Sequence, residues 1–122
     1  MYLSLFLMLC ACSPSSLDDF RHEGESICRE FAHELKGIET HEHLLKEAPK
    51  IKAYFDRLVT VMIQARKFQK EAEESQPLIN EDSLASKALL GELKRIYQLE
   101  AGREIIEKAQ KEALIKLDVA TK

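Results

Sequence analysis

The chain has 122 residues, enough for one domain; 32 % of them are Asp, Glu, Lys or Arg and 45 % are apolar. This balance is typical of a globular protein with a modest core and excludes a disordered chain. The net charge is only −3, and no cluster of Lys and Arg marks a nucleic-acid-binding surface, so we expect no nucleic-acid partner.

The first eleven residues are almost wholly apolar and carry no charge. As a helix they would be roughly 16 Å long, about half of the ~30 Å hydrocarbon core of a bilayer. Such a stretch is too short to cross a membrane comfortably, but it suits the hydrophobic part of a secretory signal. We therefore expect a signal peptide over residues 1–11. A buried apolar helix and an uncleaved hydrophobic anchor are the alternatives.

The sequence Leu9-Cys10-Ala11-Cys12 resembles the lipobox of bacterial lipoproteins, with an aliphatic residue three positions before a cysteine and a small residue directly before it. The resemblance implies that Cys12 receives a diacylglycerol and that the signal is cut between Ala11 and Cys12. It also implies acylation of the new N-terminus. A redox or metal role for Cys10 and Cys12 together is disfavoured because no second ligand pair lies nearby.

Residues 12–16 are small and polar and include a proline, so they are expected to form a lipidated tether between the anchor and a domain over residues 17–122. Because stable anchoring takes two or more acyl chains, an acylated Cys12 would hold the domain at the membrane. The resemblance places the chain in the cell envelope, lipid-anchored. In such lipoproteins an Asp after the cysteine favours the inner membrane; here Ser13 favours the outer membrane, facing the periplasm.

A first helix is predicted from about Ser16, an N-cap residue followed by Asp18 and Asp19, to a stop at Gly37. Cys28 would be the only free thiol of the mature chain and is expected in the core; an intermolecular disulfide is the alternative. The apolar face of this helix comprises Leu17, Phe20, Ile27, Cys28, Phe31, Ala32 and Leu35.

A short helix capped by Thr40 is predicted next, and Pro49 is expected to separate it from a long central helix. The width of the apolar stripe in the central helix predicts neighbours on two sides. The stripe follows a regular four-and-three spacing through Ile51, Phe55, Leu58, Met62, Ala65, Gln69 and Ala72.

Pro77 interrupts the pattern, and Asn80 or Asp82 is expected to cap the next helix. A glycine inside a helix is unfavourable, so Gly102 either weakens one long helix or separates two helices. We favour one long helix, straight or bent at Gly102. Acidic and basic residues of this last helical region stand three or four positions apart, as in Glu92 with Arg95 and Glu107 with Lys111. Such pairs predict a solvated helix face, and the alternative is a docking surface for a partner helix. The expected apolar set is Leu84, Leu89, Leu90, Leu93, Ile96 and Tyr97, and a second face of small residues contains Ala101, Ile105, Ala109 and Ala113.

These elements predict an all-α fold, a small antiparallel bundle of three main helices plus one short helix. The candidates for metal ligands are Glu30, His33, His41 and His43. Glu30-x-x-His33 has the spacing of di-iron bundles, but no second Glu-x-x-His follows on the later helices. We favour solvated surface histidines and expect no cofactor.

The sequence contains no nucleophile elbow and no glycine-rich phosphate loop, and Cys28 with His33 lacks an orienting partner, so we expect no enzyme. The preferred function is a structural or protein-interaction module with an envelope partner or self-association. The alternative is a periplasmic metal- or ligand-binding protein using the His- and Glu-rich first third. A small helical enzyme would need a pocket that joins polar groups between the first and the central helix.

Overall fold

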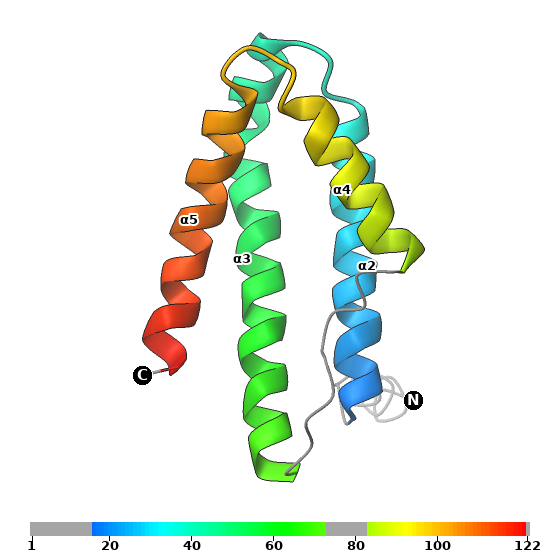
Figure 1. The fold of residues 1–122 in the computed structure, drawn as a ribbon, viewed down its shortest axis with the longest axis vertical. Coiled ribbons are helices and arrows are strands. Elements are labelled where there is room, and N and C mark those ends of the chain that lie inside the picture. The colour runs from blue at the N-terminus through cyan, green and yellow to red at the C-terminus, as the bar shows by residue number, and fades with distance from the viewer. Residues whose placement is uncertain (1–15, 73–82, 122) are drawn as a thin grey trace, which may run out of the picture.

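The computed structural model describes residues 16–72 and 83–121, which form helices without any strand (Figure 1). The expectation of a small all-α bundle is confirmed. The elements are α2 (Leu17–Lys36), α3 (His41–Ala72), α4 (Leu84–Ile96) and α5 (Gly102–Thr121).

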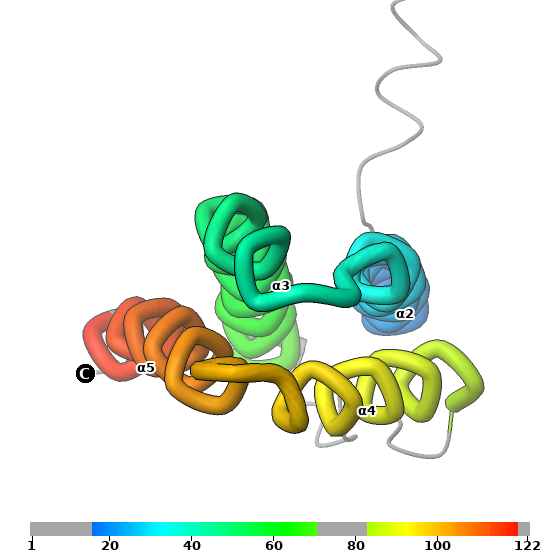
Figure 2. Tube along the Cα trace, turned by 90° about the horizontal axis from the view of Figure 1, so that it is seen from above, coloured from blue at the N-terminus to red at the C-terminus, as the bar shows by residue number. Residues whose placement is uncertain are grey.

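Consecutive helices run in opposite directions, as expected for an antiparallel bundle (Figure 1). The contacts are distributed differently from a simple up-and-down bundle, because α4 packs along α2 and α5 packs along α3, each parallel to its neighbour. Helices α4 and α5 have few mutual contacts and diverge from the turn that joins them. Figure 2 shows the result, a layer of α2 and α3 lying on a layer of α4 and α5.

Helix α2 follows the prediction closely. The hydroxyl of Ser16 accepts a hydrogen bond from the backbone N–H of Asp19 at 3.2 Å, and the helix ends at Lys36 with Gly37 as its C-cap. A capping hydroxyl of this kind satisfies one of the N–H groups that the first turn leaves without a helical partner. The whole predicted apolar face of α2 is buried.

The predicted boundary at Pro49 is wrong, because α3 is one continuous helix with Pro49 inside it. Thr40 does cap it, accepting a hydrogen bond from the N–H of His43 at 3.1 Å. Leu44 and Ile51 lie seven residues apart on one helix face and are both buried in the main core, so burial on either side favours continuity. Pro49 itself is exposed. Proline has no backbone N–H, so the carbonyl four residues earlier loses its helical hydrogen bond, and at this exposed position water can supply the missing donor.

The favoured long last helix is also wrong, because α4 ends at Ile96 and α5 begins at Gly102. Between them Ala101 has a left-handed backbone with a φ of 57°. The reversal lets Ile96 and Ile106 both reach the same core, fully buried, which one straight helix would prevent. The cap of α4 is Ser83, whereas the expected caps Asn80 and Asp82 lie outside the described residues.

The main core is shared by all four helices, and α3 contacts both α2 and α5 as predicted for the central helix. A second, smaller cluster joins the beginning of α2 to the end of α3, where the rings of Phe20 and Phe68 lie 5.7 Å apart. Of the expected apolar set in α4, Leu84 and Leu90 are exposed instead of buried. The small-residue face of α5 is partly confirmed, since Ala109 and Ala113 are buried.

Candidate functional site: a charged cleft between α2 and α3

The predicted lipidation residue, Cys12, and the predicted cleavage point between Ala11 and Cys12 lie outside the described residues, as do residues 1–11 and 12–15 of the predicted signal and tether. The first described residue is Ser16, the cap of α2. Within the described helices, none combines the length and the apolar character needed to span a bilayer.

The two metal candidates on α2 are both exposed and are used differently from a metal site. The carboxylate of Glu30 forms an ion pair with Arg57 of α3, with 2.9 Å between Oε2 and Nη1. His33 lies on the exposed surface of α2. In residues 16–72 and 83–121, no three His, Cys, Asp or Glu side chains are close enough together to hold a metal ion.

The other two metal candidates lie near the start of α3. Nδ1 of His41 lies 2.7 Å from the backbone oxygen of Glu100, which ties α3 to the α4–α5 turn. Nε2 of His43 lies 3.7 Å from Glu47, one helical turn further along α3. Both histidines therefore have local structural partners.

Cys28 is buried in the main core, as predicted, with 8 % of its surface exposed. Burial raises the pKa of its thiol, and the neighbouring Glu25 carboxylate raises it further. A raised pKa keeps the sulfur protonated at neutral pH, whereas the thiolate is the reactive form. The geometry supports a packing role and disfavours an intermolecular disulfide.

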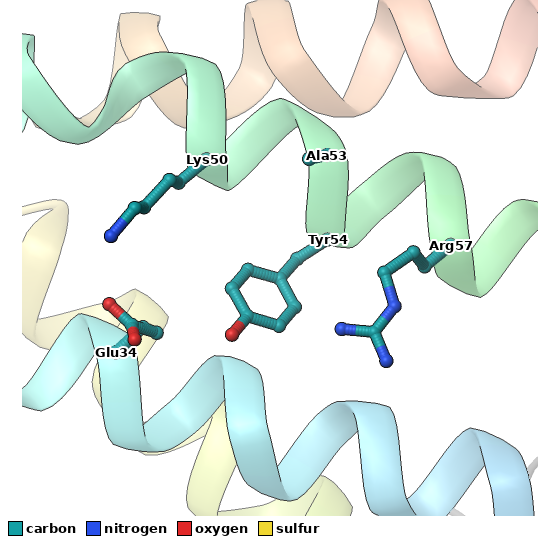
Figure 3. A pocket seen from close by; sticks show the side chains of 5 residues that line it. All are labelled: Glu34, Lys50, Ala53, Tyr54 and Arg57. Atoms are coloured by element: carbon teal, nitrogen blue, oxygen red, sulfur yellow. The ribbon is translucent and has the colours of Figure 1, made fainter.

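A cleft opens between α2 and α3, with a volume of about 220 Å³ (Figure 3). Figure 3 shows three side chains of α3 reaching toward α2 and one carboxylate of α2 reaching toward α3. Its lining residues are Glu34, Lys50, Ala53, Tyr54 and Arg57. The cleft thus brings polar side chains of α2 and α3 together, the arrangement that the sequence analysis required of a pocket between the first and the central helix.

The three polar residues from α3 share one helix face because Lys50, Tyr54 and Arg57 are spaced four and three residues apart. Arg57 is held in place by its ion pair with Glu30 and lies over the Tyr54 ring, 5.4 Å from the ring centroid. A cation at this distance is attracted to the ring face. The donors of the cleft are therefore held on one wall by α3.

Tyr54 is positioned from behind by Phe31, a fully buried residue of α2. The two rings are stacked, with 5.0 Å between centroids and 8° between planes. Burial raises the pKa of the Tyr54 phenol; Glu34 and Glu30 raise it further, and Arg57 and Lys50 act in the opposite direction. The phenol therefore stays protonated at neutral pH and serves as a hydrogen-bond donor, not as a general base.

We expect the free energy of unfolding to fall as the pH rises above about 8.5. The pKa values of Cys28 and Tyr54 are both raised by folding, so the unfolded chain loses these protons at lower pH than the folded chain. The stability that they contribute is complete below the ordinary pKa of each group and is lost as the pH rises through the raised one. Urea unfolding followed by circular dichroism at pH 7, 9 and 10.5 measures this.

The variants Cys28→Ala and Tyr54→Phe separate the two contributions. Each should be less sensitive to alkaline pH than the wild type, because each lacks one of the groups with a raised pKa. If the wild type and both variants lose the same stability between pH 7 and 10.5, the prediction fails.

A second hollow of about 270 Å³ lies between α2 and α3 nearer the beginning of α2. It shares Arg57 with the first cleft and is floored by Ile27 and Val61. Its remaining lining residues are Glu23, Asp56, Thr60 and Gln64. The α2–α3 face therefore carries two polar hollows that meet at Arg57, whose ion pair with Glu30 crosses from α3 to α2.

The sequence considerations missed this site because its residues belong to two helices whose mutual rotation no local pattern specifies. One signal was available, the four-and-three spacing of Lys50, Tyr54 and Arg57. This spacing placed two cations and a phenol on one face. It did not reveal that Glu34 stands opposite.

No protein-family profile matches this chain, and searches of curated proteins and of solved structures returned no similar protein. The candidate site therefore rests on its own geometry.

Proposed function

We infer that this chain is a lipid-anchored interaction module of the bacterial cell envelope, attached to the outer membrane through Cys12 and facing the periplasm. The observation that carries the proposal is the lipobox-like sequence Leu9-Cys10-Ala11-Cys12, placed directly after an uncharged apolar stretch. It is supported by the position of the capped start of α2 at Ser16, four residues after Cys12.

The geometry of an anchored domain follows from this spacing. Four residues reach at most about 14 Å, so a lipid on Cys12 would keep the beginning of α2 close to the membrane surface. The end of α3 lies at the same end of the molecule, because Phe20 and Phe68 are in contact (Figure 1). The α4–α5 turn lies at the opposite end, about 30 Å away along the 20-residue helix α2. The cleft lined by Tyr54 and Arg57 lies between α2 and α3 on the side of the domain, where a partner or a ligand can reach it.

The anchor is tested by metabolic labelling with a clickable palmitate analogue. The wild type should carry the label and fractionate with membranes, and Cys12→Ser should lose both properties because serine offers no sulfur for the thioether. Cys10→Ser is the matched control, two residues away within the same apolar stretch, and should keep the label. A label that persists in Cys12→Ser contradicts the anchor.

The same labelled cells test the interaction role by in-cell cross-linking of the full-length wild type. We expect a cross-linked envelope protein or a second copy of the chain. A protein that remains monomeric and yields no envelope partner contradicts this part of the proposal. The metal-binding alternative is not proposed, because Glu30, His33, His41 and His43 do not converge.

A further inference from the structure

The cleft lined by Glu34, Lys50, Ala53, Tyr54 and Arg57 has the composition of a ligand site, and its polar groups are unequally engaged. Arg57 is paired with Glu30, and Lys50 is paired with Glu47 at 3.6 Å. Within residues 16–72 and 83–121, the Tyr54 hydroxyl and the Glu34 carboxylate form no hydrogen bond or ion pair. The cleft thus presents one donor and one anionic acceptor for which the described part of the chain supplies no partner.

Charges of both signs surround the cleft. Glu30 and Glu34 stand on α2, and Lys50 and Arg57 stand on α3, where Glu47 adds a third carboxylate beside Lys50. Glu34, Lys50 and Arg57 line the same cleft as Tyr54, and Glu30 is tied to it through its ion pair with Arg57 (Figure 3). A purely anionic ligand would be repelled by the carboxylates of α2, and a purely cationic one by the cations of α3. A ligand that carries both charges is attracted to both walls.

We propose that this cleft binds a small zwitterion with a carboxylate and an ammonium group, of the size of a free α-amino acid. The carboxylate accepts hydrogen bonds from the Tyr54 hydroxyl and the Arg57 guanidinium, and the ammonium group pairs with Glu34. The volume of about 220 Å³ lies below the ~300–1,000 Å³ of pockets for drug-sized ligands, which selects a small molecule. This inference is independent of the lipid anchor.

Ala53 provides the space for the ligand. It lines the cleft between Lys50 and Tyr54, its side chain ends at one methyl group, and it is exposed on the surface of α3. A leucine at this position fills the cleft without entering the core. Ala53→Leu therefore tests binding in a protein that keeps its fold.

The experiment is a titration of the isotope-labelled full chain in mild detergent, followed by backbone amide NMR, with three matched probes. L-Alanine carries both charges, propionate lacks the ammonium group, and ethylamine lacks the carboxylate. We expect L-alanine to shift the amide signals of Ala53, Tyr54 and Arg57 saturably, with a Kd on the order of 1 mM for so open a cleft. Propionate and ethylamine should bind at least about tenfold more weakly, because each loses one charge-assisted contact.

Variants identify the site. Glu34→Gln and Tyr54→Phe should each weaken L-alanine binding about tenfold, and Ala53→Leu should abolish it. The matched control is Ala88→Leu, the same substitution at an exposed position of α4, which should bind L-alanine like the wild type. Equal binding of propionate or ethylamine, shifts that survive in Ala53→Leu, or the absence of saturable shifts up to 50-fold above the expected Kd would each overturn the proposal.

Discussion

Replacement of Gly102 by alanine is expected to destabilise the protein by about 3 kcal/mol, because the added methyl group has no space. A Cβ at this position would overlap the carbonyl oxygen of Ile96 and lie 2.9 Å from the Ile96 carbonyl carbon. Both atoms are backbone, so they cannot move aside by a rotamer change. Relief requires the α4–α5 turn to open, which pulls the fully buried Ile96 or Ile106 out of the core.

The same substitution elsewhere provides the control. At Gly91, in the exposed middle of α4, a Cβ meets no atom within 4 Å. Gly91→Ala should therefore stabilise the protein by about 0.5–1 kcal/mol, because alanine loses less backbone entropy in a helix. Urea unfolding followed by circular dichroism at 222 nm measures both variants. Two variants that change stability by the same amount and sign would show that the close approach at Gly102 does not govern the turn.

Loss of the Arg95 guanidinium has the second large expected effect. Arg95 comes from the last turn of α4 and reaches the end of α2, where Nη1 donates to the carbonyl oxygen of Ile38 at 2.8 Å and Nη2 to that of Leu35 at 2.6 Å. Its Nε donates to Glu92 at 2.8 Å. The Leu35 carbonyl also accepts from the backbone N–H of Ile38 at 3.0 Å, so Arg95 adds a charged donor to the last turn of α2 and supplies one to Ile38 just beyond the helix end.

Arg95→Met should destabilise the protein by about 2–3 kcal/mol, because methionine keeps the aliphatic stem but leaves both carbonyls without their charged donor. Arg95→Lys should recover only part of this loss, since an ammonium group cannot form the planar two-carbonyl bridge. Urea unfolding at pH 7 measures the difference.

The matched control is Arg103→Met on α5. Arg103 is exposed, pairs with Glu107 at 3.7 Å and lies 5.5 Å from the centroid of the Tyr97 ring. At an exposed site each of these contacts contributes about 0–1 kcal/mol. If Arg95→Met proves no more harmful than Arg103→Met, the bridge does not hold α4 on α2.

The candidate site shows where prediction from sequence ends. Glu30 was selected as a metal candidate for its spacing to His33 along α2, but in the fold it pairs with Arg57, 27 residues away on another helix. Spacing along one helix establishes which residues share a face. It does not establish what stands opposite, and that is what distinguishes a metal ligand from one half of an ion pair.

In the fold, too, some features follow from local sequence and others are set by tertiary packing. The buried face of α2, its cap at Ser16, and the central position of α3 all follow from local spacing and capping chemistry, and all are confirmed. The two wrong boundaries, at Pro49 and Gly102, fall where local preference and tertiary packing oppose each other. At Pro49, a residue that disfavours helix continuation is overruled by buried neighbours on both sides. At Gly102, the apolar spacing favours one continuous helix, but the chain turns there because the turn lets residues on both sides of Gly102 be buried in the same core.

By itself the sequence determined the helical class and the faces of α2 and α3 that are buried, because each depends on residues close together in the chain. The lipobox-like sequence ending at Cys12 is local in the same way, and the anchor that it implies stays a prediction. Only the tertiary structure decided that α4 lies along α2 and α5 along α3, that Arg95 caps α2, and that Glu34 faces Lys50, Tyr54 and Arg57 across a cleft. These features depend on how the helices rotate about their axes and cross. That choice is made by the total burial of the core and not by any single stretch of sequence.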